Sequence, residues 1–219
     1  MLITEKRSKS TTSEAYKGLR TNIQYSSTDK KIESILVTSA DPAEGKSTIS
    51  SNLALSFAQE DKKVILIDCD LRKPSIHKHF RVSNALGLSD LLIGKVQFSE
   101  VITQFDERLT ILTSGKIPPN PSEMLGSKNM STLLDELKKQ YDVIILDSAP
   151  LQMVTDAQIL STKVDGTLLV IKARTTKKET VLQAKGLLEK VGANILGIVL
   201  NGVDEIKGKY DHYYGSDHR

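Results

Sequence analysis

The residues most suited to chemistry are a glycine, a lysine and two hydroxyl side chains within the run ADPAEGKST, residues 40–48. This run stands between an apolar, strand-like segment and a helical pattern. Backbone N–H groups of such a loop and of the following helix cradle phosphates, the lysine reaches phosphate oxygens and the hydroxyl holds Mg²⁺. The sequence therefore predicts nucleotide binding by Glu44, Gly45, Lys46, Ser47 and Thr48.

The loop departs from the usual pattern at its first position, where Ala40 replaces a glycine. An alanine adopts a positive φ only with strain, so we expect a negative φ at Ala40. A chance Gly-Lys-Ser turn that caps a helix is the alternative interpretation, which the flanking strand and helix patterns disfavour.

Two further segments place carboxylates where apolar, strand-like runs end. Asp68, Asp70 and Arg72 follow one run in VILIDCDLR, and Asp147 ends VIILD. Open α/β sheets bind ligands at the carboxyl ends of their strands, where carboxylates could hold Mg²⁺ or accept a proton. Arg72 would add positive charge near a transferring phosphate. Solvated aspartates in a turn are the alternative, because Asp often follows a strand.

The elements that must position these residues alternate between short apolar runs and amphipathic stretches, which is typical of βα units around a parallel sheet. We expect strands near residues 34–39, 64–68, 109–113, 143–147, 167–171 and 195–200. Apolar residues at helical spacing predict helices within 49–58, 130–137 and 181–191, and a further one within 12–25 with the stripe Ala15, Leu19 and Ile23. The prolines at 118, 119 and 121 predict a stiff loop. The predicted fold is a doubly wound, mostly parallel α/β sheet of the P-loop NTPase type.

The composition is that of a globular chain. Hydrophobic residues make up 39% and charged residues 26% of the 219 residues, which excludes a collagenous or largely disordered protein. The single cysteine, Cys69, is expected to be buried and favours a reducing compartment. No apolar run approaches the ~20 residues that cross a bilayer, and the N-terminus is polar, so we expect a cytoplasmic protein without a membrane span. A net charge of +3 is too weak to indicate nucleic acid as a partner.

Taken together, these motifs resemble the bacterial tyrosine kinases that accompany capsular and extracellular polysaccharide export. The resemblance runs from about Glu14 to Tyr214. Residues 40–48 resemble the family's Walker A motif, ILIDCDLRKP its Walker A′ and VIILD its Walker B, and LTSGKIPPNPSEML resembles a stretch common in the family. Related partition and septum-site ATPases carry a lysine just after the first loop position, where this chain has Asp41.

This resemblance implies ATP and Mg²⁺ as cofactors. Lys46 and Ser47 would bind the nucleotide and the metal, Lys46 and Arg72 would neutralise the γ-phosphate, and Asp68 would orient or deprotonate a tyrosine hydroxyl. Asn201 resembles the residue that reads adenine in these folds, although an Asn that ends a strand is otherwise usually a turn residue. The metal and catalytic shell would be completed by Asp68, Asp70 and Asp147.

Both ends of the chain carry expectations from the family. Glu14, Lys17 and Arg20 stand where the family has a Glu-x-x-Arg-x-x-Arg motif that joins subunits in a ring, and Lys17 loses the bidentate pairing of the arginine it replaces. After Walker B the usual Asp-Thr-Pro-Pro is Asp-Ser-Ala-Pro here. The last residues are expected to form a flexible tail whose tyrosines a neighbouring subunit phosphorylates, namely Tyr210, Tyr213 and Tyr214.

The predicted function is that of an ATP-dependent protein-tyrosine autokinase that acts in trans and regulates polysaccharide synthesis and export. Expected partners are a separate transmembrane co-polymerase that activates the kinase at the inner face of the membrane, further copies in a ring, and a phosphotyrosine phosphatase. Alternatives are a membrane-associated ATPase switch of the partition or septum-site type, and a non-catalytic nucleotide-binding regulator of an export complex. We divide the chain into an N-terminal arm (1–30), a kinase domain (31–203) and a tail (204–219).

Overall fold

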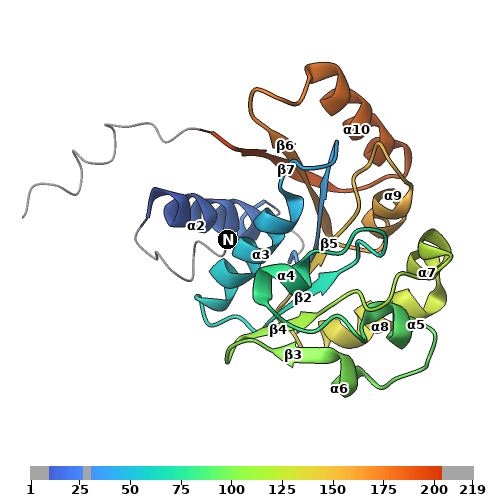
Figure 1. Cartoon of the computed structure of the whole chain (residues 1–219). Helices are drawn as coiled ribbons and strands as arrows, with labels where there is room; N and C mark the ends of the chain where they lie inside the picture. Colours follow the sequence, from blue (N-terminus) through green and yellow to red (C-terminus); the bar gives the residue numbers. More distant parts are fainter. Residues whose placement is uncertain (1–9, 27–30, 204–219) are drawn as a thin grey trace, which may run out of the picture.

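A seven-stranded sheet forms the centre of the computed structural model, which describes residues 10–26 and 31–203 (Figure 1). Its strands lie in the order β3-β4-β2-β5-β1-β6-β7. All neighbours run parallel except β3 and β4, which are antiparallel. The strands are β1 (Ser34–Ser39), β2 (Val64–Asp68), β3 (Ile102–Gln104), β4 (Leu109–Leu112), β5 (Val143–Asp147), β6 (Gly166–Lys172) and β7 (Ile195–Asn201).

Helices cover both faces of the sheet, and each face has its own apolar core. One core joins the sheet to α2 (Thr11–Gln24), α3 (Lys46–Ala58) and α4 (Ile76–Phe80). The other core joins it to α5 (Leu88–Leu92), α6 (Phe98–Val101), α7 (Pro121–Gly126), α8 (Lys128–Lys138), α9 (Asp156–Ser161) and α10 (Lys178–Lys190). Strands β1, β2 and β5 are buried at every position, as expected for strands that are covered on both sides.

The predicted doubly wound sheet is confirmed, with all six expected strands and the four expected helices in place. The structure adds the short strand β3, and Pro121 opens α7 where a stiff loop was expected, because proline suits the first turn of a helix. Cys69 is buried, as expected. Of the stripe predicted for α2, Ile23 is buried and Leu19 packs against the core, whereas Ala15 is exposed. Ser13, Tyr16 and Arg20 are buried in addition.

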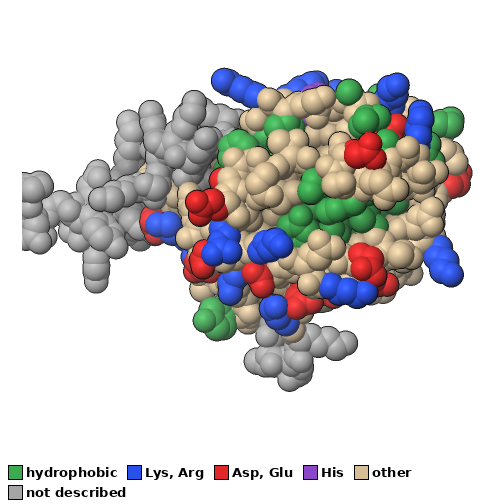
Figure 2. Space-filling view, turned by 90° about the horizontal axis from the view of Figure 1, so that it is seen from below, with side chains coloured by type: hydrophobic (Ala, Val, Ile, Leu, Met, Phe, Trp, Pro, Cys, Tyr) green, Lys and Arg blue, Asp and Glu red, His purple; other side chains and the backbone are tan. Residues whose placement is uncertain are grey.

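The surface mixes charges of both signs. Seen from below, Lys and Arg side chains lie among Asp and Glu side chains around a central group of apolar ones (Figure 2). Within residues 10–26 and 31–203, no helix combines the length and the apolar character needed to cross a bilayer.

The strand order explains how the three predicted motifs come together. Strands β2, β5 and β1 are consecutive neighbours in the sheet, and all three run in the same direction. The carboxyl ends of these three strands therefore lie side by side at the same end of the sheet, although they are up to about a hundred residues apart in the chain. The phosphate-binding loop follows β1, while Asp68 and Asp147 end β2 and β5 in direct register.

Candidate active site

The loop between β1 and α3 (residues 40–45, here the P-loop) contains two residues with a positive φ, a conformation that residues with a Cβ atom rarely adopt. Gly45, the N-cap of α3, has a φ of 92°, and Ala43 has a φ of 63°. A Cβ atom on Gly45 would also lie 2.1 Å from the side-chain amide nitrogen of Asn201. Only glycine therefore fits at position 45. Ala40 is buried and avoids a positive φ, as expected from its side chain.

Lys46 extends across the carboxyl ends of the strands to Asp70, which follows β2, and to Asp147, which ends β5. Its Nζ lies 2.9 Å from Asp70 Oδ2, 4.0 Å from Asp147 Oδ2 and 3.4 Å from the hydroxyl of Ser47. Burial alone would lower the pKa of Lys46, but the nearby charges of Asp147 and Asp70 outweigh burial and raise that pKa. The lysine is therefore charged at neutral pH and lies beside the N-terminus of α3.

Asp68 and Asp147 form a buried pair of like charges, because their strands pair in register. Asp68 Oδ2 accepts the N–H groups of Ser75 and Ile76, both at 3.0 Å, and Oδ1 accepts the N–H of Asp70 at 3.2 Å. Burial, together with the charge of Asp147, raises the pKa of Asp68 to about 7. Burial also raises the pKa of Asp147, against the opposing effect of Lys46.

Asp147 offers a test of whether these residues suit a magnesium ion. Its Oδ1 accepts a hydrogen bond from Ser50 at 3.0 Å, whereas its Oδ2 is buried and has no hydrogen-bond donor within the described part of the chain. In that same part, no three acidic, histidine or cysteine side chains converge into a ready-made metal cage. Mg²⁺ is commonly held by one or two carboxylates together with substrate phosphates, so Asp147 Oδ2, which lies 4.0 Å from the Lys46 ammonium, and the hydroxyl of Ser47 fit this ion.

Arg72 is committed to an ion pair on the far side of the cluster. Its Nε and Nη2 donate to the two carboxylate oxygens of Asp156 at 2.8 and 3.1 Å, and Nη2 donates to Ser122 Oγ at 3.0 Å. Asp156 is fully buried at the start of α9. The sequence did not indicate Asp156 or Ser122 as partners of Arg72. They lie 84 and 50 positions from Arg72 in the chain, and no local pattern connects residues that far apart. A role for Arg72 beside the transferring phosphate stays a prediction.

The remaining predicted nucleotide contacts surround the P-loop. Asn201, at the end of β7, donates from its side chain to the carbonyl oxygen of Glu44 at 2.9 Å. The buried carboxylate of Glu44 accepts the N–H of Asp41 at 2.8 Å and the hydroxyl of Thr176. Thr48 lies in the first turn of α3, half-buried. Thr176, between β6 and α10, is a site residue that the sequence did not reveal.

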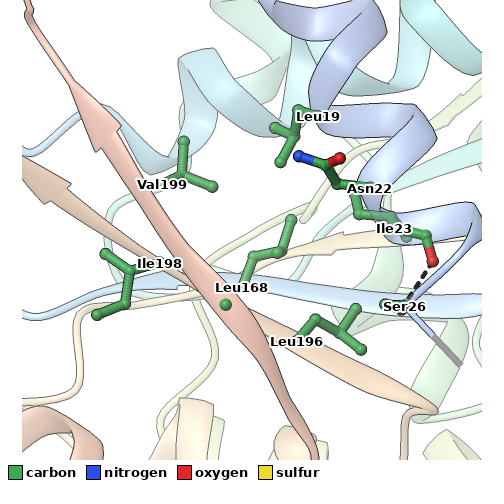
Figure 3. A pocket seen from close by; sticks show the side chains of 9 residues that line it. Leu19, Asn22, Ile23, Ser26, Leu168, Leu196, Ile198 and Val199 are labelled. Carbon is green, nitrogen blue, oxygen red and sulfur yellow. Dashed lines mark hydrogen bonds between the residues drawn. The ribbon is translucent and has the colours of Figure 1, made fainter.

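A hollow lies between α2 and the edge strand β7. One part has a volume of about 120 Å³ and is lined by apolar side chains that include Leu19 and Ile23 of α2, which lie opposite Leu196 of β7 (Figure 3). The adjoining part, of about 570 Å³, extends from the N-terminal half of α2 to Asn201 and Gly202. The hollow and the P-loop therefore meet at Asn201.

The three residues of the predicted subunit-joining motif have different surroundings. Glu14 and Lys17 form an exposed ion pair of 2.7 Å on the surface of α2. Arg20 is buried within the chain, where Nη1 donates to the carbonyl oxygen of Ser56 at 2.6 Å and Nη2 lies 2.5 Å from Glu60. The predicted phosphorylation sites Tyr210, Tyr213 and Tyr214 lie outside the described residues.

Comparisons with known proteins show which family the chain belongs to. A sequence model described as an AAA domain matches residues 33–196. The tyrosine-protein kinase YwqD of Bacillus subtilis is 44% identical over 209 residues, which are 95% of this chain and 88% of that protein. The chain belongs to the bacterial tyrosine-kinase family.

Further relatives of this bacterial tyrosine kinase point the same way. The putative tyrosine-protein kinase CapB of Staphylococcus aureus is 44% identical over 211 residues, 95% of this chain and 92% of that protein. The solved kinase domain of Escherichia coli ETK superimposes with a TM-score of 0.90 at 35% identity, over 95% of this chain and 82% of that one. The family predicted from the Walker motifs is confirmed, and neither a partition-type ATPase nor a non-catalytic regulator is favoured.

Proposed function

We propose that this bacterial tyrosine kinase transfers the γ-phosphoryl group of ATP to tyrosine hydroxyls. The observation that carries this proposal is the convergence of Lys46, Asp70 and Asp147 at the N-terminus of α3, with ion-pair distances of 2.9 and 4.0 Å from the lysine. A helix N-terminus with a charged lysine attracts phosphate, and buried carboxylates beside it attract a divalent cation. Phosphoryl transfer depends mainly on such positioning and charge stabilisation.

Each residue of the cluster has a distinct proposed role. Lys46 would exchange its contact with Asp70 for phosphate oxygens, and Ser47 and Asp147 would hold Mg²⁺. When bound, Mg²⁺ neutralises charge on the phosphates. Asp68, whose pKa is about 7, takes up the proton of the attacking tyrosine, because a base works best when its pKa lies near the operating pH. Asn201 contacts adenine with the amide hydrogen that its bond to Glu44 leaves free.

The proposed substrates are the chain's own C-terminal tyrosines, Tyr210, Tyr213 and Tyr214, phosphorylated by a neighbouring subunit. Family membership supports this role and the regulation of capsular or extracellular polysaccharide synthesis. We further propose that a separate transmembrane protein holds the kinase at the inner face of the membrane and activates it, that copies assemble in a ring, and that a phosphatase reverses the modification.

Mass spectrometry of the full-length chain after incubation with Mg²⁺ and ATP tests the proposed activity. Phosphotyrosine is expected in the wild type and absent in Lys46→Met, whose fold should be intact because Lys46 contacts carboxylates rather than the apolar cores. Equal phosphotyrosine in both proteins would show that the site is wrongly assigned. ATP hydrolysis without any phosphotyrosine would favour an ATPase switch instead.

A mixing experiment tests transfer between subunits. A Lys46→Met chain that keeps its tyrosines is combined with an active chain in which Tyr210, Tyr213 and Tyr214 are phenylalanine. Label on the Lys46→Met chain is the expected result. An unlabelled mixture, alongside a wild type that labels normally, would exclude transfer in trans.

A further inference from the structure

Glu44 occupies a position in the P-loop that calls for an explanation. It stands between Ala43 and Gly45, whose φ values are 63° and 92°. A left-handed conformation is unfavourable for a residue with a Cβ atom such as Ala43, so contacts must hold this loop in its shape. Glu44 itself is only 4% exposed. Its negative charge would also repel a phosphate group bound in the loop.

The contacts of Glu44 tie the P-loop to two other parts of the chain. One carboxylate oxygen accepts the N–H of Asp41 within the same loop, at 2.8 Å. The other accepts the hydroxyl of Thr176, whose Oγ1 in turn accepts the N–H of Lys172 at 2.9 Å. The main-chain oxygen of Glu44 accepts the side-chain amide of Asn201 at 2.9 Å.

These contacts use both oxygens of the Glu44 carboxylate and direct them toward protein donors. The loop after β1 is thereby joined to the β6–α10 connection through Thr176 and to the end of β7 through Asn201. The bond between Glu44 and Thr176 is half-buried and spans 132 positions of the sequence. Because these contacts hold the P-loop, its backbone N–H groups stay oriented for phosphate even before a ligand binds.

We propose that Glu44 and Thr176 are positioning residues, which hold the P-loop in its phosphate-binding shape before the nucleotide arrives. This inference rests on the proposed nucleotide site. A preformed loop spares the nucleotide the free energy of ordering it, and that free energy appears in affinity. Loss of the Glu44–Thr176 contact should therefore weaken ATP binding and change the rate of the bound complex little.

Calorimetric binding of Mg²⁺-ATP and steady-state kinetics of autophosphorylation measure these two effects separately. Thr176→Val should raise the Kd for ATP about three- to tenfold, the range expected for one lost hydrogen bond, with kcat changed less than about twofold. Thr176→Ser, which keeps the hydroxyl, should restore the wild-type Kd. Thr175→Val is the matched control, because the hydroxyl of Thr175 is exposed and, among the described residues, donates to the carbonyl of Ala173 in the same loop and not to the P-loop.

A double-mutant cycle separates positioning from direct contact. Glu44→Ala should raise the Kd about tenfold or more, and adding Thr176→Val to it should have little further effect, because both changes break one contact. Glu44→Gln, which keeps one acceptor oxygen, should fall between Glu44→Ala and the wild type.

Several results would overturn the proposal. A Thr176→Val protein with wild-type ATP affinity, or effects of the two changes that simply add, would show that the contact does not prepare the loop. Glu44→Gln as defective as Glu44→Ala, with Thr176→Val silent, would show that Glu44 contacts the nucleotide or its metal directly. Thermal melts check folding, and the Thr176 variants decide the question if Glu44→Ala fails to fold. A wild type that binds no Mg²⁺-ATP would instead refute the proposed function itself.

Discussion

Replacing Arg20 with alanine should loosen α2 from α3 even in an isolated monomer. The guanidinium lies between the two helices, where it donates to the carbonyl oxygen of Ser56 at 2.6 Å and pairs with Glu60 at 2.5 Å. The resemblance to the family's Glu-x-x-Arg-x-x-Arg motif instead predicts contacts between subunits for this arginine. The two roles differ in what they predict for a monomer, because only an intrachain role changes its stability.

The expected loss in the free energy of unfolding is centred on about 2–3 kcal/mol, because the two contacts of Arg20 together span about 1.5–4 kcal/mol. A buried hydrogen bond from a charged group contributes about 1.5–3 kcal/mol. The Glu60 side chain is 40% exposed, so its ion pair with Arg20 adds at most about 1 kcal/mol. At about 2–4 °C for each kcal/mol in a chain of this size, the melting temperature should fall by roughly 4–12 °C.

Thermal denaturation at a concentration where light scattering shows a monomer measures this change. Hydrogen exchange of residues 11–24 adds a local measurement, since α2 could detach before the sheet unfolds. Lys17→Ala is the matched control, because it removes only an exposed pair with Glu14, worth about 0.2–0.5 kcal/mol. If Arg20→Ala melts like the control and exchange in α2 is unchanged, Arg20 does not anchor this helix.

Three further predictions follow from the site. Gly45→Ala should weaken Mg²⁺-ATP binding at least about tenfold by calorimetry, because a Cβ would meet Asn201 at 2.1 Å and the φ is 92°; wild-type affinity would show that the loop adapts freely. Asp147→Asn should raise the Mg²⁺ concentration needed for half-maximal phosphorylation, and an unchanged titration would place the metal elsewhere. The pKa of Asp68 is raised to about 7, so protonation favours folding. The stability that protonated Asp68 contributes is complete below the ordinary pKa of 3.8 and is lost as the pH rises through about 7. In thermal melts without Mg²⁺, the Asp68→Asn variant should therefore lack this fall in melting temperature with rising pH. Equal pH profiles of the melting temperature in the variant and the wild type would refute the reasoning.

Sequence patterns were sufficient for the elements that are long and periodic. The six predicted strands are apolar on both faces, and α3, α8 and α10 carry full helical stripes, so their residues alone define them. Strand β3 has three residues and α4 has five, which is too short for any period to show. Along α2 the predicted apolar stripe was right at Leu19 and Ile23, which pack on the core, and wrong at Ala15, which is exposed. Arg20 is buried because its guanidinium donates to Ser56 on α3, a contact that no helical period reveals.

The same division holds within the site. The Walker motifs are local, and the structure brings the residues they single out, Lys46, Asp68, Asp70 and Asp147, together at the carboxyl ends of the strands, while their roles stay predictions. Asp156 and Thr176 could not be found in this way, because their partners Arg72 and Glu44 are 84 and 132 positions away. Such contacts depend on the strand order, which no single motif encodes.

The two edges of the sheet differ in how well they resist unwanted association. At one edge, β3 is only three residues long and runs antiparallel to β4, and none of its residues is buried. So short a strand offers few backbone groups with which another strand could pair. At the other edge β7 has seven residues and, among the described residues, pairs only with β6. Its side chains Ile198 and Leu200 are 50% and 53% exposed beside that open backbone. Long apolar edges promote aggregation, so we expect association of the purified chain to begin at β7 rather than at β3.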